Sequence, residues 1–128
     1  MANNPEANKA SVRSFYDLAF NRHKPSEAAA QYLGKTYRQH NPKAADGAQP
    51  FVDFVTGFLK AFPQLHVQFK RIVAESDLVV LHSHFVRQPG DPGLAVVDIF
   101  RLEDGRLVEH WDVLQEVPTQ AANTNTMF

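Results

Sequence analysis

The spacing of the hydrophobic residues changes near the middle of the chain. Up to Pro63 the apolar residues recur three and four positions apart, which is the period of helices with one buried face. From His66 onward they recur mostly at alternate positions, as they do in strands with two different faces. Helices followed by a run of antiparallel strands are typical of the α+β class, in which the helices pack on one face of the sheet.

The first half predicts three helices. The first begins after Asn4, which can cap its N-terminus, with Pro5 as the first helical residue. Its buried face carries Val12, Phe15, Tyr16 and Ala19. A second, shorter helix is expected from Ser26 to Leu33, where Gly34 ends it.

The third helix has the clearest pattern. Pro50 lies near its start, Pro63 ends it, and the apolar residues between them form one continuous stripe. We interpret the phenylalanines of this stripe as core residues rather than as part of a cofactor site. Residues 36–41 fit no single element, and residues 42–47 predict a loop.

The second half predicts four strands. Their expected ranges are His66–Ala74, Leu78–Arg87, Leu94–Leu102 and Arg106–Gln115. The turn Glu103-Asp104-Gly105 is a strong hairpin signal between the last two. We expect an antiparallel sheet that curves over the three helices and forms a concave pocket. No internal repeat or linker interrupts the pattern, so residues 1–128 are predicted to be a single domain.

Alternation along the strands predicts which side chains share a face. On the second strand His82 and His84 point to one side, and the other side carries Val79, Leu81, Ser83 and Phe85. Both faces are largely apolar, so we expect this strand to be central and covered on both sides. On the third strand Asp98 is the one carboxylate in an otherwise apolar run from Ala95 to Phe100.

The hairpin turn decides which residues face Asp98. A three-residue loop places Asp98 opposite His110. The same register puts Asp112 opposite Val96. A two-residue turn would instead place Trp111 opposite Asp98. We prefer the first register, because a glycine in third place suits a bulged loop.

A carboxylate in an apolar cavity is a candidate general base. Loss of water disfavours its charged form, which raises its pKa and its basicity. With imidazoles nearby, Asp98 would have the groups needed to remove a proton next to a carbonyl. The alternative is a structural pair, in which a buried Asp and His satisfy each other and hold two strands together.

The pair His82 and His84 also permits a metal hypothesis. Two imidazoles on one strand face can bind one ion, and a bound water would then make a hydrolytic centre. The third ligand would be Asp98, His110 or Asp112. No further metal-binding motif accompanies the pair in the sequence, so our main interpretation contains neither metal nor cofactor.

Composition narrows the function further. The 128 residues are 44% hydrophobic and 21% charged, as in ordinary globular proteins. The 13 basic and 14 acidic residues give a net charge of −1, which argues against a nucleic-acid partner. The absence of cysteine excludes thiolate chemistry. No apolar run is long enough for a membrane span and no secretory signal is present, so we expect a cytoplasmic protein without a membrane partner.

The segment from Asp98 to Val113, DIFRLEDGRLVEHWDV, resembles the SnoaL-like polyketide cyclases. The segment 37–42, YRQHNP, followed by Asp46-Gly47, adds to this similarity, which covers nearly the whole chain. These cyclases belong to the group with the cone-shaped fold of nuclear transport factor 2 and ketosteroid isomerase (NTF2-like). The characterised members close a polyketide ring by intramolecular aldol condensation without metal or cofactor.

The resemblance implies roles for individual residues. Asp98 occupies the position of the aspartate that takes a proton from an activated carbon, and His84 matches its histidine partner. Where an amide side chain is expected, this chain has His82. We expect five side chains to contact the substrate, namely His40, His82, His110, Trp111 and Asp112. For His40, capping of the local backbone is an alternative.

Two functions from different classes follow from these observations. The first is a cofactor-independent acid–base catalyst of aldol cyclisation or enolisation of a small carbonyl compound, with Asp98 as base and His84 and His82 as donors to the enolate oxygen. The second is a non-catalytic binding module for a small apolar ligand, motivated by the 10 phenylalanines. A homodimer is the expected cover for the outer sheet face, which would carry Val97, Ile99 and Trp111.

Overall fold

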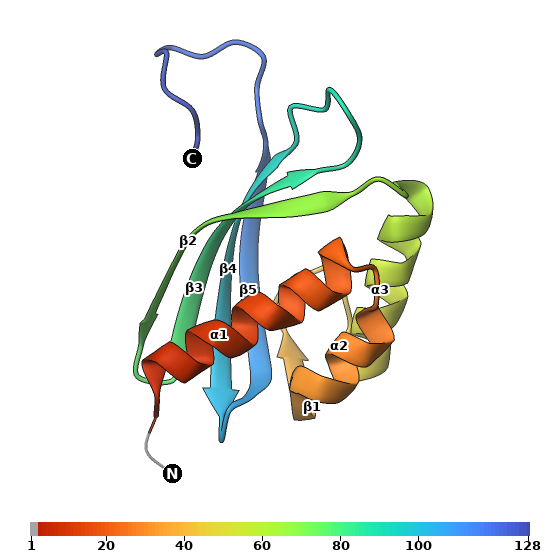
Figure 1. Ribbon diagram of the computed structural model, residues 1–128, viewed down its shortest axis with the longest axis vertical. Coiled ribbons are helices and arrows are strands. Elements are labelled where there is room, and N and C mark those ends of the chain that lie inside the picture. Colours follow the sequence, from red (N-terminus) through yellow and green to blue (C-terminus); the bar gives the residue numbers. More distant parts are fainter. Residues whose placement is uncertain (1–2) are drawn as a thin grey trace.

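The helices of the N-terminal half form where prolines and apolar spacing predict them. In the computed structural model, which describes residues 3–128, these helices are α1 (Pro5–Tyr16), α2 (Pro25–Tyr32) and α3 (Ala48–Ala61) (Figure 1). Asn4 caps α1, because its side-chain oxygen accepts a hydrogen bond from the Ala7 amide at 3.1 Å. After Tyr16 the chain widens into a single π-helical turn, Asp17–Asn21.

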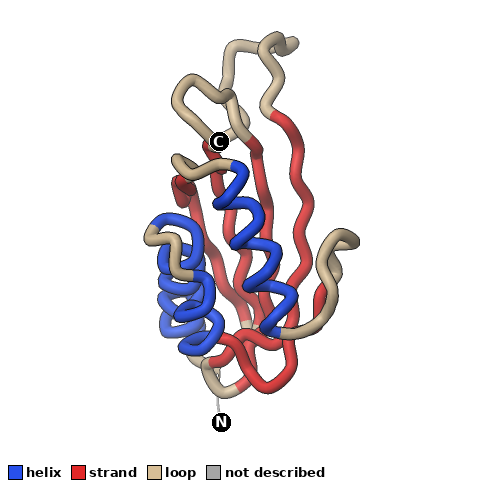
Figure 2. The backbone as a smooth tube through the Cα atoms, turned by 90° about the vertical axis from the view of Figure 1, so that its right-hand side faces the viewer, coloured by secondary structure: helices blue, strands red, loops and turns tan. Residues whose placement is uncertain are grey.

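The strands form one five-stranded sheet in the order β1-β5-β4-β3-β2. They are β1 (Leu33–Gln39), β2 (His66–Glu75), β3 (Leu78–Val86), β4 (Leu94–Glu103) and β5 (Arg106–Glu116). Neighbours are antiparallel except that β1 runs parallel to β5. Figure 2 shows the helices gathered on one side of the sheet. The predicted α+β class and the helix-covered sheet are therefore confirmed.

Strand β1 is the element that the hydrophobic pattern does not predict. Its first residue, Leu33, was expected to end the second helix, which instead ends at Tyr32. Only Leu33 and Tyr37 of this strand are buried, so the strand carries too few apolar residues for a clear alternation. Its partner β5 lies far away in sequence, and a parallel pairing of this kind leaves no local turn signal.

The register of the β4–β5 hairpin differs from the expected one. Asp98 pairs with Asp112, and Phe100 pairs with His110, so the predicted pairing of Asp98 with His110 is wrong by two residues. The turn has two residues, Asp104 and Gly105, with φ of 49° and 78°.

A bulge near this turn places His110 on the same face of the sheet as Asp98, as predicted. Leu102 pairs with Leu107 and Arg101 with Glu109, which leaves Val108 as an extra residue in β5. A two-residue turn alone would have placed Trp111 opposite Asp98, but the bulge shifts the register by one more position. Asp98 and His110 consequently stay on the same face of the sheet.

The two faces of the sheet are covered unequally. The β3 side chains Val79, Leu81, Ser83 and Phe85 face the helices and are buried. On the outer face His82 and His84 are half-buried, while Val73 and Val113 are 58% and 69% exposed. The expectation that β3 is covered on both sides is therefore confirmed on the helix side and met only in part on the outer face, where the β3 side chains are half-buried or, at Leu78, 39% exposed. Association into a homodimer through this outer face stays a prediction.

The C-terminal segment after β5 lies over part of the outer face. It folds back toward β2 and β3 (Figure 1), and the ring of Phe128 stacks on His84 with centroids 4.3 Å apart. The ammonium group of Lys70 lies 5.4 Å from the centroid of the same ring. The segment thus covers its own sheet and does not close the pocket on the helix side.

The core lies between the helices and the sheet. Phe15 of α1 packs its ring 4.8 Å from that of Phe51 of α3 and 6.2 Å from that of Phe100 of β4, measured between centroids. Within residues 3–128, no helix is long and apolar enough to cross a membrane.

Candidate active site

Asp98 lies in the middle of β4 and points into the core beneath the helices. Its side chain is 0% exposed. One carboxylate oxygen, Oδ1, accepts a hydrogen bond from the Tyr16 hydroxyl at 2.7 Å and lies 2.7 Å from His110 Nε2. The other oxygen, Oδ2, has no hydrogen-bond partner among the described residues. Burial raises the pKa of Asp98, and the contacts with His110 and Tyr16 offset this increase only in part.

His110 is held in one orientation by Gln39. The imidazole Nδ1 lies 2.7 Å from Gln39 Oε1, which also accepts the backbone amide of Asn41 at 3.1 Å. Because this amide can only donate, the Gln39 atom is the carbonyl oxygen and Nδ1 must carry a proton. Nε2 is therefore the nitrogen that shares a proton with Asp98.

Tyr16 supplies the second hydrogen bond to Asp98. It is the last residue of α1, and its ring packs edge-on against Phe20 and Phe100, with centroid distances of 4.9 and 5.2 Å. Burial and the neighbouring Asp98 raise the pKa of Tyr16 well above its ordinary value, so the phenol stays protonated and donates a hydrogen bond to Asp98.

Tyr16 and Gln39 are residues of the candidate site that the sequence reasoning missed. Tyr16 was assigned only to the buried face of the first helix, although a buried tyrosine hydroxyl requires a polar partner. That requirement was the available signal. Gln39 belongs to β1, which had no recognisable pattern, so nothing in the sequence indicated its position beside His110.

Asp112 and Asn41 lie at the mouth of the pocket. Asp112 Oδ2 accepts a hydrogen bond from Asn41 Nδ2 at 3.0 Å and lies 3.8 Å from His110 Nε2. The side chain of Asp112 is 10% exposed, in contrast to the fully buried Asp98. The predicted placement of Asp98, His110 and Asp112 on one face is correct.

These residues line a small internal cavity that continues into an open groove. The cavity has a volume of about 60 Å³, and Tyr16, Tyr37, Asp98, His110 and Asp112 are among its walls. The groove has a volume of about 760 Å³ and lies between α3 and the ends of β4 and β5. The walls shared by the cavity and the groove include Asn41, Phe54, Phe58, Leu94, Asp112 and Leu114.

His84 and His82 do not lie beside Asp98, so their expected placement in the site is wrong. Leu81 pairs with Asp98 across β3 and β4, and successive residues of a strand alternate between faces. Both histidines therefore point to the outer face of the sheet. There the Nε2–H of His84 donates to the Pro92 carbonyl at 2.7 Å, and Nδ1 of His82 contacts the guanidinium group of Arg71.

Trp111 and His40 form a separate pair outside the pocket. Trp111 pairs with Ile99, so it too points away from Asp98. The His40 ring stacks on the indole of Trp111 with centroids 4.8 Å apart, and His40 Nε2 lies 2.7 Å from Glu109 Oε2. Neither residue is among the walls of the cavity, contrary to the expectation that both contact substrate.

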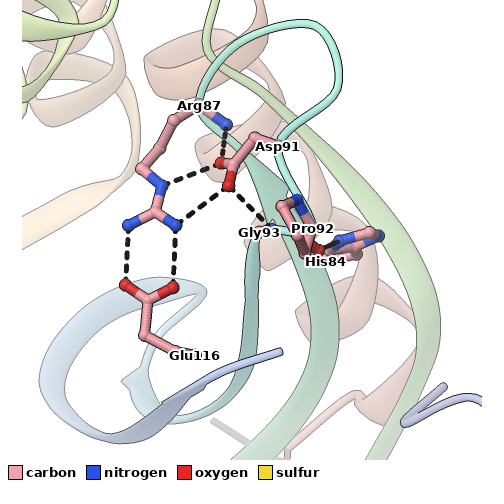
Figure 3. A network of polar contacts seen from close by, with 6 residues as sticks. All are labelled: His84, Arg87, Asp91, Pro92, Gly93 and Glu116. Atoms are coloured by element: carbon pink, nitrogen blue, oxygen red, sulfur yellow. Dashed lines mark hydrogen bonds and ion pairs between the residues drawn. The ribbon is translucent and has the colours of Figure 1, made fainter. Parts of the chain in front are cut away.

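A fixed loop borders the open groove. Figure 3 shows Arg87 forming paired hydrogen bonds to Asp91 and to Glu116, with distances between 2.7 and 3.0 Å. The guanidinium group lowers the pKa of the Asp91 carboxyl, which also accepts the backbone amides of Arg87 and Gly93. Arg87 thereby holds residues 87–93 against the end of β5.

The geometry also tests the metal hypothesis. The set of His82 and His84 with Asp98 cannot form, because the imidazoles and the carboxylate lie on opposite faces. Asp98, His110 and Asp112 bring potential ligand atoms within 4.8 Å of one another. Asp98 Oδ1 and His110 Nε2 are, however, already joined at 2.7 Å, so we describe these two as a hydrogen-bonded pair, with Asp112 Oδ2 3.8 Å from Nε2.

The comparison with known families agrees with this fold. The profile of the SnoaL-like domain matches residues 12–110, which is most of the chain. The chain therefore belongs to the SnoaL-like domain family, whose fold is of the NTF2-like type. The comparison with curated proteins finds no significant match.

Solved structures share the fold over most of their length. TsrD from Streptomyces laurentii is 26% identical, with a TM-score of 0.68 over 83% of this chain and 89% of that one. AclR from Streptomyces galilaeus, a proposed hydroxylase, is 25% identical, with a TM-score of 0.70 over 88% and 81%. A proposed ketosteroid isomerase from Kribbella flavida is 20% identical, with a TM-score of 0.72 over 93% and 85%.

Proposed function

We propose that this protein is a cofactor-independent acid–base catalyst that removes a proton from the carbon next to a carbonyl group. The enolate so formed would undergo aldol cyclisation or isomerisation. The observation that carries the proposal is Asp98, a fully buried carboxylate whose Oδ2 has no hydrogen-bond partner within residues 3–128, while Oδ1 is bound by two hydrogen-bonding side chains.

The hydrogen bonds around Asp98 suit a change of charge during the reaction. Before proton transfer, Tyr16 and His110 both lie against the Asp98 carboxylate. When Oδ2 takes the substrate proton, the carboxyl group becomes neutral and a weaker acceptor. The Tyr16 and His110 donors then become available to the enolate oxygen, a role we had assigned to His84 and His82.

The size of the pocket indicates how the substrate would bind. A cavity of about 60 Å³ has room for only the reacting part of a molecule. The groove of about 760 Å³ falls in the size range of ordinary ligand sites, and Phe54, Phe58 and Leu114 line it. We therefore propose a substrate with a carbonyl end that enters the cavity and an apolar body that stays in the groove.

The relatives are compatible with this chemistry. SnoaL-like cyclisation and ketosteroid isomerisation both begin with removal of a proton next to a carbonyl, and one of the similar folds is a proposed ketosteroid isomerase. The second candidate function, a binding module for an apolar ligand, is favoured by the same groove and needs no free carboxylate oxygen.

Deuterium exchange tests the proposal. We expect the wild-type protein to accelerate exchange of the α-protons of 2-tetralone with D₂O, followed by NMR, and the Asp98→Asn variant to lose this acceleration. Acceleration that survives in Asp98→Asn would show that Asp98 is not the base. Tight binding of 2-tetralone by both proteins without any exchange would support the binding module instead.

The activity is expected to rise with pH through a midpoint above 3.8, the ordinary value for the pKa of this carboxyl. Asp98 acts as a base only when ionised, and burial raises its pKa, so protonation abolishes activity on the acid side of this midpoint. Measuring kcat/KM for exchange from about pH 3 to about pH 9 checks this, and an acid limb at or below the ordinary carboxyl value would contradict it.

A further inference from the structure

The buried base needs a route by which its proton can leave. The Asp98 side chain is fully buried, His110 is 4% exposed and Tyr16 is 5% exposed. None of these groups can exchange protons freely with bulk water from its place in the core. If the proton stayed on Asp98, it could only return to the substrate, and the site would not be reset by solvent.

His110 provides the first part of such a route. Its Nδ1–H is held by Gln39, so Nε2 is the nitrogen that can take up and release a proton. Nε2 lies between two carboxylates, 2.7 Å from Asp98 Oδ1 and 3.8 Å from Asp112 Oδ2. The imidazole is thus placed to receive a proton from one carboxyl group and to pass it to the other.

Asp112 provides the second part. It pairs with Asp98 across β4 and β5, and it lines both the internal cavity and the open groove. Of Asp98, His110 and Asp112, Asp112 has the most exposed side chain, at 10%. Asn41 donates to its Oδ2 at 3.0 Å and holds this atom on the side that faces His110.

We propose that Asp112 is a proton-relay residue that connects the buried Asp98–His110 pair to water in the groove. This inference rests on the proposed function and adds a route for the proton. In the resting state the pair holds one proton between Asp98 Oδ1 and His110 Nε2. The substrate C–H bond breaks, its proton goes to Asp98 Oδ2, and its electron pair becomes part of the enolate.

The extra proton then leaves by way of His110. The Nε2 proton passes to Asp112 Oδ2 as a rotation of the Asp112 carboxyl closes the 3.8 Å separation. A turn of the neutral Asp98 carboxyl then brings its protonated oxygen to His110 Nε2, which takes up that proton, and Asp112 releases its proton to water in the groove. One proton enters from carbon and one leaves to solvent, so the step needs no oxidant or reductant, and it can run in reverse to protonate an enolate.

The relay predicts where an isotopic label goes. The probe is 3-cyclohexen-1-one carrying deuterium at C2, which isomerises to 2-cyclohexen-1-one when a proton is removed from C2 and one is returned to C4. With the relay intact, the deuteron that reaches His110 Nε2 follows the first proton to Asp112, so most of the deuterium exchanges with water before the return step. In Asp112→Asn the label stays on the Asp98–His110 pair, so the deuterium found at C4 should increase severalfold.

Three further variants separate a relay from a structural role. Asp112→Glu keeps a carboxylate and should restore loss of the label, whereas Asp112→Ser, a second carboxylate-free variant, should retain it. Asp53→Asn, which changes an exposed carboxylate on α3, should behave as the wild type does. A residue that only supports Asn41 would change the rate without changing how the label is divided between C4 and water.

The outcomes for the relay and for the proposed function differ. Conversion by the wild type with equal retention of label in wild type, Asp112→Asn and Asp112→Ser would overturn the relay and leave the function standing. Absence of any conversion or exchange by the wild type, with both this probe and 2-tetralone, would overturn the proposed function and the relay together.

Discussion

The Asp98→Asn variant is expected to lose activity by a factor of about 10² to about 10⁴, the usual contribution of a general base. The amide is nearly the same size as the carboxyl group, so the packing of β4 should not change. With its oxygen in the position of Oδ1, the amide can still accept the Tyr16 hydroxyl beside His110 Nε2, and the amide nitrogen takes the place of Oδ2. What disappears is the free Oδ2 lone pair that takes the proton.

The same change should not destabilise the protein at neutral pH. Burial raises the pKa of Asp98 in the folded state, so ionisation of this group favours the unfolded chain. The wild type therefore loses unfolding free energy as pH rises from the ordinary carboxyl pKa to the raised pKa of folded Asp98. The variant has no ionisable group at this position and does not show this loss. We therefore expect the Tm of Asp98→Asn relative to wild type to increase with pH.

Thermal unfolding at acidic and at neutral pH, measured together with the exchange rate, separates the two effects. Asp53→Asn, on the exposed face of α3, serves as the matched control and should change neither quantity. Loss of activity accompanied by a large fall in Tm at neutral pH would show that Asp98 is mainly a structural residue, as the alternative interpretation of the Asp–His pair holds.

The Gly93→Ala variant is expected to lose about 3 kcal/mol or more of unfolding free energy. Gly93 has a φ of +86°, a conformation that strains any residue with a Cβ atom. A Cβ built there would lie 2.3 Å from the Phe85 carbonyl oxygen and 2.6 Å from His84 Nε2. The nearer of these atoms belongs to the backbone of β3, so it cannot move aside without disturbing the sheet.

Gly90→Ala provides a matched control in the same loop. Gly90 has a similar φ of +82°, but no atom of the part of the chain that the structure describes lies within 4 Å of a Cβ atom at this position. It should therefore show only the conformational cost, about 1–2 kcal/mol. Denaturant unfolding of both variants isolates the contribution of the steric contact. Equal losses for the two would mean that the loop shifts away from β3 without cost.

The local elements follow from the sequence because their signals are local. The cap at Asn4, the proline at Pro5 and the apolar period predict α1, and alternation predicts the four strands from β2 to β5. Strand β1 escapes this reasoning, because its stability comes from a parallel partner distant in sequence and its own side chains show no period.

The partner of Asp98 depends on details that spacing does not reveal. The register between β3 and β4 pairs Leu81 with Asp98, so His84 points to the outer face of the sheet. Which β5 side chains lie on the same face as Asp98 depends on the two-residue turn together with the bulge at Val108. With only one of these two features, Trp111 would lie on that face in place of His110. The imidazole that meets Asp98 is therefore His110.

By itself, the sequence determined the α+β class, the order of the three helices and of strands β2 to β5, and Asp98 as the lone carboxylate on an apolar strand, because periodicity along a chain records which positions are buried. Only the tertiary structure decided that Tyr16 and Gln39 complete the site, and that His82 and His84 do not belong to it. These contacts join α1, β1, β4 and β5, and their geometry depends on strand parity and on packing between distant segments.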